Sequence, residues 1–191
     1  MGRGKDGERF TALYELTNER IAAYALRRCT TPEDAADLVA ETYLVAWRRI
    51  DVVPSGHDGL LFLYVTARQL LSNQSRRVQR DDALIVRLAD ELRTARHDPH
   101  DEAALTALER LMALPGDLRE LLMLAGWEGL NARDLGRVLG CSATAARIRL
   151  HRARARLQAE STARDALAKR EPAWRHEHGG DASTRCVPGE A

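Results

Sequence analysis

Five arginines and no acidic residue lie between Ser142 and Gln158, in a segment whose other residues are mostly small or aliphatic. An arginine side chain donates two hydrogen bonds to a guanine edge in the major groove of DNA, or it pairs with backbone phosphates. The pattern therefore favours DNA binding over its alternative, an arginine-rich solvated helix in a helical bundle. The candidate DNA-contacting residues are Thr144, Ala145, Arg147, Ile148, Arg149 and Arg152.

A helix over this segment has a second, apolar face. Ala146, Leu150, Ala153 and Leu157 follow one another at intervals of four, three and four residues, which places them on one side of a helix. We expect this side to pack on leucines of the preceding segments. These are Leu121, Leu122, Leu135 and Leu139.

The residues before this helix predict a helix-turn-helix. Asn131 is suited to cap a short helix, and Gly140 is suited to end it in the left-handed conformation. Ser142 is suited to cap the long helix, which we expect to continue to about Lys169. A short helix, a turn of a few residues and a second helix are the parts of this motif.

A second group of candidates lies in a predicted helix from about Leu60 to Arg77, where aromatic, amide and basic side chains are interleaved. Aromatic rings stack on unpaired bases, and arginines follow the backbone of single-stranded DNA. A core position for the two aromatic residues, with the arginines in water, explains the same pattern equally well. The candidates are Phe62, Tyr64, Arg68, Gln69, Asn73, Arg76 and Arg77.

An acidic helix is predicted from Pro32 to about Ile50. Thr31 is a suitable cap, proline is favoured at the first helical position, and acidic residues suit the first turn. An acidic face can dock a basic protein surface, although the pattern alone favours a plain solvated surface. The charged face holds Asp34, Asp37, Glu41 and Arg48, and an opposite apolar stripe holds Val39, Tyr43, Ala46, Trp47 and Ile50.

The other segments complete an all-helical pattern. Apolar residues at helical spacing predict a helix over residues 10–28, and residues 53–59 predict a loop. Residues 78–101 are polar and are predicted to form an interdomain linker, within which Leu84, Ile85, Leu88 and Leu92 suit a short amphipathic helix. Helical patterning resumes over residues 102–113 and breaks at Pro115. Residues 171–191 are predicted to form a disordered tail.

The composition limits the class of protein. The chain has 191 residues, of which 45% are hydrophobic and only 5% aromatic, which suits one ordinary domain or two small helical ones. The net charge is only +1, but charges are segregated, acidic over residues 30–46 and basic over residues 61–80 and 142–158. Segregated charge suggests separate surfaces for separate partners. Three scattered cysteines, no signal peptide and no membrane-spanning run lead us to expect a cytoplasmic protein.

No enzyme motif is found in the sequence, whether a Gly-rich phosphate loop, G-x-S-x-G or H-E-x-x-H. His176, His178 and Cys186 in the tail are in principle able to bind a metal. Structural zinc prefers a compact four-ligand site, so a flexible polar tail explains these residues more simply. We therefore expect a protein that is not an enzyme and that carries no metal or cofactor.

Three stretches together resemble the extracytoplasmic-function (ECF) group of bacterial RNA polymerase sigma factors. PEDAADLVAETYLVAW, residues 32–47, is similar to the family's core-polymerase-binding helix. FLYVTARQLL, residues 62–71, is similar to its −10 promoter-reading and melting helix. Residues 114–157, which end in RLHRARARL, are similar to its −35-reading domain. The resemblance covers residues 8–160. Its last stretch alone is shared in outline with other helix-turn-helix regulators.

The sequence departs from the family's pattern at four positions. The family usually has Gln where Ala40 stands and Phe where Tyr43 stands. Its −10 helix often begins with Trp, here Phe62, and often has Asn where Gln69 stands. Ala40 bears on the strength of the polymerase contact, whereas Phe62 and Gln69 bear on the −10 sequence preference.

The resemblance implies an all-α protein of two small helical domains joined by a flexible linker, the second a helix-turn-helix. Residues 1–80 would bind core RNA polymerase and the −10 element, residues 81–102 would form the linker, and residues 103–160 would read the −35 element. Residues 161–191 would form the helix end and the tail. The implied partners are core RNA polymerase, promoter DNA and an anti-sigma factor, with no membrane insertion and no small-molecule substrate. The polymerase-binding candidates are Asp34, Asp37, Leu38, Glu41 and Arg48.

Three alternatives to a sigma factor remain at this point. A response-regulator-like transcription factor would need a receiver domain, and the N-terminal half shows no alternation of strands and helices. A helix-turn-helix regulator that acts without being a polymerase subunit shares the C-terminal pattern. A helical module that only binds a protein partner would not let core polymerase start transcription at defined sites.

Overall fold

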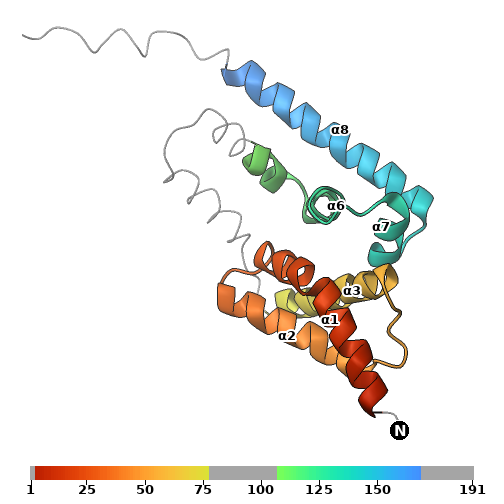
Figure 1. Cartoon of the computed structure of the whole chain (residues 1–191). Coiled ribbons are helices and arrows are strands. Elements are labelled where there is room, and N and C mark those ends of the chain that lie inside the picture. The colour runs from red at the N-terminus through yellow and green to blue at the C-terminus, as the bar shows by residue number, and fades with distance from the viewer. Residues whose placement is uncertain (1–2, 78–106, 169–191) are drawn as a thin grey trace, which may run out of the picture.

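A computed structural model describes residues 3–77 and 107–168, and every regular element in these two ranges is an α-helix (Figure 1). The predicted all-α class with a C-terminal helix-turn-helix is thereby confirmed. The predicted linker, the short helix within it and the tail lie outside the described residues. The elements are α1 (Arg3–Leu26), α2 (Pro32–Arg48), α3 (His57–Arg77), a helix over residues 107–113, α6 (Gly116–Gly126), α7 (Ala132–Leu139) and α8 (Ala143–Ala168).

Local capping chemistry sets the starts of α2, α7 and α8 and the end of α7, as the sequence predicts. The Thr31 hydroxyl accepts a hydrogen bond from the Asp34 N–H at 3.0 Å, and Pro32 opens α2. The Asn131 side chain accepts bonds from the N–H groups of Arg133 and Asp134 at the start of α7. Gly140 ends α7 in the left-handed conformation with φ of 68°. The Ser142 hydroxyl accepts a bond from the Ala145 N–H at 3.1 Å.

Two helices begin earlier than predicted. Helix α1 starts at Arg3 rather than Phe10, and its first turns are largely exposed, so no apolar periodicity marks them in the sequence. Helix α3 starts at His57 rather than about Leu60, because Gly56 with φ of 64° ends the loop. Gly59 then lies inside the first turn, where an added Cβ would meet the Pro54 carbonyl oxygen at 2.5 Å. Gly59 thus permits close contact between the first turn of α3 and the Pro54 carbonyl. In the sequence the same glycine indicates a loop.

The N-terminal domain is a bundle of α1, α2 and α3, each packed against the other two. Its core is aliphatic and aromatic, and the largest fully buried side chains there are Ile21, Tyr24, Leu63 and Tyr64. Tyr24 and Tyr64 pack ring against ring with centroids 5.2 Å apart. The Tyr43 hydroxyl shares a 2.7 Å hydrogen bond with the buried Thr17 hydroxyl, so the polar atoms of this core are paired.

In the C-terminal domain, α8 lies across α6 and α7. The predicted apolar face of α8 is confirmed: Ala146 and Ala153 are fully buried, and Leu150 and Leu157 are half-buried. Their partners include the predicted leucines, with Leu121 and Leu135 buried and Leu122 and Leu139 partly buried in the same cluster. The small residues on α8 let it approach α7 closely.

The two domains are packed against each other rather than separate. Helix α3 packs against α7 (Figure 1). One continuous apolar cluster contains buried residues of both domains. From the sequence we expect two domains joined by a flexible linker, which would leave their relative placement undefined. In the structure that placement is fixed by contacts between residues far apart in the chain, which local patterns do not reveal. None of the described helices has the length and hydropathy that crossing a bilayer requires.

Gly136 in α7 provides a test of the helix-turn-helix packing. A Cβ at this position would lie 2.7 Å from the Cys141 carbonyl oxygen and 3.1 Å from the Ala143 nitrogen, both of them backbone atoms. We expect Gly136→Ala to lower the free energy of unfolding by about 1–3 kcal/mol. Gly126→Ala, where a Cβ meets nothing within 4 Å, is the control and should be neutral or stabilise by up to ~1 kcal/mol. Equal thermal stability of the two variants would contradict the close approach.

Candidate functional site

The arginine-rich side of α8 is open to solvent. Arg147, Arg149 and Arg152 are exposed, as is Ile148 with 47% of its surface accessible, and Ala145 is half-buried near the helix start. At about 100° per residue, positions 145, 148, 149 and 152 share one side of the helix. Thr144 is exposed in the first turn beside Ile148. The helix geometry therefore brings five of the six predicted residues together on or beside one face of the second helix of the helix-turn-helix, whereas Arg147 is exposed on another side.

Helix α3 divides its predicted DNA-contacting residues between surface and core. Arg68, Gln69 and Asn73 are exposed, and Phe62 is half-buried. The backbone at Arg76 and Arg77 is helical, but their side chains lie outside the described part.

Tyr64 is a core residue in this arrangement. Its side chain is fully buried, and its hydroxyl donates to the Glu128 carboxylate at 3.3 Å. Burial, with the Glu128 charge as the next cause, raises the pKa of Tyr64 to about 12, so the phenol stays protonated and remains a donor. Of the two explanations that the sequence leaves open, the core position holds for Tyr64. Its ring is not available to stack on a base while the domains are packed together.

Helix α2 presents three of the five predicted polymerase-binding residues fully to solvent. Asp37, Glu41 and Arg48 are exposed, whereas Asp34 is half-buried and accepts a hydrogen bond from the Thr31 hydroxyl at 2.8 Å.

Leu38 is only 4% exposed and packs with Ala25, Cys29 and Ala35 in a small cluster between α1 and α2. The buried residues of α2 are at positions 35, 38, 42, 43 and 46. The predicted apolar stripe is confirmed at Tyr43, Ala46 and Ile50, which are buried, whereas its member Trp47 remains 44% exposed. Leu38 positions α2 and is not itself accessible to a partner.

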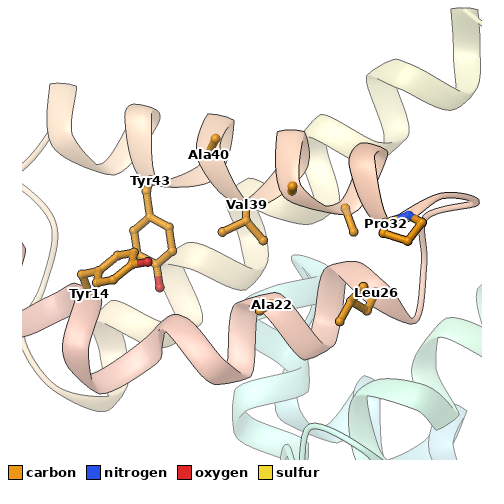
Figure 2. Close-up of a pocket in the computed structure, with 9 residues that line it drawn as sticks. Tyr14, Ala22, Leu26, Pro32, Val39, Ala40 and Tyr43 are labelled. Carbon is orange, nitrogen blue, oxygen red and sulfur yellow. The ribbon is translucent and has the colours of Figure 1, made fainter.

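A shallow apolar groove of about 420 Å³ runs between α1 and α2. Tyr14 of α1 and Tyr43 of α2 face each other at one end, with ring centroids 4.9 Å apart (Figure 2). Ala36 and Ala40 line the groove and precede the exposed acids Asp37 and Glu41 in the chain. The groove is lined by Tyr14, Ala22, Leu26, Pro32, Ala35, Ala36, Val39, Ala40 and Tyr43. Neither Asp37 nor Glu41 lines the groove, and at about 100° per residue both lie on a different side of α2 from Val39 and Tyr43.

A charged cluster between the two domains was missed by sequence reasoning. Glu128, in the turn between α6 and α7, is only 3% exposed. Its carboxylate accepts two hydrogen bonds from Arg27 at 2.8 and 2.9 Å and one from Arg28 at 3.1 Å. Arg28 also donates to Glu120 at 3.0 Å. Burial works against the charged form of Arg28, but its pKa is nevertheless raised because Glu120, Tyr24 and Glu128 face it.

Further polar contacts extend this interface. Arg20 donates to the Glu128 carbonyl oxygen at 2.7 Å. At the start of α3, the His57 ring nitrogen lies 3.1 Å from the Asp134 carboxylate, and Asp58 pairs with Arg137 of α7. The partners lie 77 to 108 residues apart in the chain. No local spacing could therefore have signalled these pairs in the sequence.

Within the two described ranges, no group of histidine, cysteine and acidic side chains is arranged to hold a metal ion. Cys29 and Cys141 carry free thiols, and burial raises the pKa of Cys29 to about 11. The tail residues His176, His178 and Cys186 lie outside the described part.

Comparison with known proteins agrees with this two-domain arrangement. Residues 13–81 match the family model "Sigma-70 region 2", and residues 105–157 match "Sigma-70, region 4". The chain is 31% identical to the ECF RNA polymerase sigma factor EcfG of Rhodopseudomonas palustris, over 73% of this chain and 77% of the relative. It is 32% identical to the ECF RNA polymerase sigma factor SigF of Caulobacter vibrioides, over 80% and 87% of the two chains.

Two solved structures have a similar fold. One is the sigma factor RpoE in complex with the anti-sigma factor NepR from Bartonella quintana, with a TM-score of 0.54, 21% identity, and 83% and 96% of the two chains covered. The other is CnrH in complex with the cytosolic domain of CnrY, with a TM-score of 0.56, 22% identity, and coverage of 81% and 88%.

A helical domain of region 2 type followed by a helix-turn-helix of region 4 type defines the sigma-70 class of transcription factors. Within that class, the chain belongs to the ECF RNA polymerase sigma factors, which direct promoter-specific initiation of transcription. The resemblance seen in the sequence is thereby confirmed.

The buried position of Leu38 generates a prediction. Leu38→Ala should lower the free energy of unfolding by about 2–5 kcal/mol, because it opens a cavity between α1 and α2. Leu44→Ala on the same helix is the control, since Leu44 is 46% exposed, and it should cost about 1 kcal/mol or less. Chemical denaturation of both variants measures the difference. Unchanged stability of the Leu38→Ala variant would contradict the buried position of Leu38.

Proposed function

We propose that this sigma factor acts through three separate surfaces, one for core RNA polymerase and two for promoter DNA. The observation that carries the proposal is the exposed arginine face of α8, opposite a fully buried alanine face, in a helix-turn-helix of region 4 type. Arginine at such positions supports direct reading of guanines in the major groove at the −35 element.

The polymerase-binding surface is assigned to the exposed side of α2. Asp37, Glu41 and Arg48 are exposed there. A partner helix with basic residues on one face would fit this surface, since opposite charges steer docking and fix its register. By family resemblance, that partner is the coiled coil of the largest polymerase subunit. Asp34 is half-buried and contributes charge from the helix start.

The −10 surface is assigned to α3. The exposed Arg68, Gln69 and Asn73 and the half-buried Phe62 supply the cation, amides and ring that single-stranded DNA requires. Arg76 and Arg77 continue the basic character of the same helix. Tyr64 is not part of this surface, because its ring packs on Tyr24 in the core of the N-terminal domain.

The protein works by binding, in the cytoplasm, without a reaction of its own. An anti-sigma factor is a further proposed partner. This rests on the two solved structures of similar fold, one of which holds the anti-sigma factor NepR and the other the cytosolic domain of CnrY.

Reconstituted transcription tests the function directly. Core enzyme and the full-length chain are incubated with fragmented genomic DNA of the source cell, and the transcript starts are sequenced. We expect starts at a defined set of sites that share two elements, none of which appears with core enzyme alone. Absence of chain-dependent starts would reject the sigma function for this protein and favour a helix-turn-helix regulator that acts without being a polymerase subunit.

The acidic surface of α2 generates the next prediction. The double reversal Asp37→Lys, Glu41→Lys should weaken assembly with core enzyme by at least about tenfold, while the free energy of unfolding changes by about 0.5 kcal/mol or less because both residues are exposed. The double reversal Asp51→Lys, Asp117→Lys changes the net charge equally at exposed positions elsewhere. If the two variants bind core enzyme equally well, the acidic side of α2 is solvent-exposed surface that does not contact the polymerase.

The arginine face of α8 generates a prediction about specificity. Arg149→Ala with Arg152→Ala should relax discrimination among −35 sequences, with a loss of about 1–3 kcal/mol for each base-reading arginine. The measurement is holoenzyme footprinting on a series of −35 variants. Arg154→Ala is the matched control, because Arg154 is exposed on a different side of α8. If the double variant discriminates among −35 sequences as well as the wild type does, Arg149 and Arg152 do not read bases.

A further inference from the structure

The two DNA-reading domains are held together by a buried ionic latch. It consists of Glu128 in the turn between α6 and α7 and of Arg27 and Arg28, which directly follow α1. Only 2% of the Glu128 side chain and 6% of the Arg28 side chain are exposed. An ion pair so far removed from water persists only when its hydrogen bonds are well made. Here the carboxylate accepts from both arginines and from Tyr64.

Aromatic contacts hold the two arginines in place. The Arg28 guanidinium lies 3.7 Å from the centre of the Tyr24 ring, and the Arg27 guanidinium lies 5.6 Å from that of Trp127. Arginine stacks on aromatic faces and keeps its donors free in the plane. Both arginines are thus oriented toward Glu128 by one ring from each domain.

The latch has consequences for the DNA-reading surfaces. It accepts a hydrogen bond from the hydroxyl of Tyr64, whose ring packs on Tyr24 in the core of the N-terminal domain. It also fixes α7 against the start of α3, where Asp134 and Arg137 of the helix-turn-helix pair with His57 and Asp58. A promoter presents its two elements at separate places along the duplex. The packed arrangement instead holds α3 and the helix-turn-helix against each other.

We propose that the Glu128 latch holds the free chain in this closed arrangement. The latch must open before the two domains can bind both promoter elements at once. The proposal rests on the proposed function for its second part only. Residues 78–106 connect the two domains along the chain. Cys29 and Cys141, the cysteines of the described ranges, are free thiols, so no disulfide within those ranges has to break when the domains separate. Removing the Glu128 charge leaves Arg28 in the closed interface with Glu120 as its remaining carboxylate partner. Arg28 is better solvated in the open form, which shifts the balance toward opening.

Single-molecule energy transfer in the full-length chain tests the latch. Fluorophores are attached through non-natural residues at Val52 and Ala155, which are exposed and lie in different domains. The wild-type chain alone should populate one high-efficiency state. Glu128→Gln, which keeps the shape of the side chain, should raise the ratio of open to closed molecules at least about tenfold. Glu19→Gln on the exposed side of α1 is the matched control and should leave the ratio unchanged.

A second variant covers the case in which Glu128→Gln does not fold. Arg28→Met removes the more buried of the two arginine partners of the Glu128 carboxylate, together with the Arg28–Glu120 pair, and should open the chain in the same way. The double variant should open less than the sum of the two single effects, because both single changes remove the Arg28–Glu128 pair. A wild-type chain that is mainly open, or variants with the distribution of Glu19→Gln, would overturn the latch.

The same labelled chain, bound to core enzyme on promoter DNA, tests whether opening is needed. We expect the high-efficiency state to disappear in the promoter complex. If the high efficiency persists while transcription starts correctly, the proposal is overturned although the sigma function stands. A chain that is closed alone but never supports transcription rejects the proposed function without affecting the latch.

Discussion

The Glu128 carboxylate is the point on which the arrangement of the whole molecule depends. A charge with this little exposure is unfavourable unless donors surround it, and its three donor side chains all come from the other domain. The turn that carries Glu128 must therefore sit against the end of α1, and α7 is brought against α3 as a result. Apolar contacts alone would allow more than one packing of two small helical domains. The directional bonds to Arg27 and Arg28 select one.

Each functional helix divides its circumference between packing and chemistry. Helix α8 buries alanines at positions 146 and 153 and so approaches α7 closely, which leaves its arginine side free. Helix α2 buries Leu38 and Ala46 and exposes Asp37 and Glu41 on another side. Charge segregation along the sequence becomes charge segregation on surfaces because helical periodicity separates the faces. A nearly neutral chain can thus offer an acidic surface to a protein and basic surfaces to DNA.

Local patterns in the sequence were sufficient for the parts of the fold that local forces determine. The caps at Thr31, Asn131 and Ser142 and the left-handed Gly140 were predictable because each acts within four residues of itself. The apolar face of α8 was predictable because its period is strict.

The remaining features depend on tertiary contacts that no local pattern encodes. Leu38 and Tyr64 lie on helices with apolar residues around much of the circumference, so periodicity could not decide which side is inside. The pairing of Arg27 and Arg28 with Glu128 spans about one hundred residues. The roles of individual residues in binding polymerase and DNA remain predictions.

Promoter binding by the full-length wild-type chain, with and without core enzyme, tests the central claim most directly. The affinity for a promoter duplex and for random DNA of the same length is measured at one fixed salt concentration, since salt strongly alters such affinities. The closed arrangement and the small net charge of +1 predict weak, sequence-independent binding by the chain alone. Addition of core enzyme should produce tight binding to the promoter only. Tight and promoter-specific binding by the free chain would contradict the account.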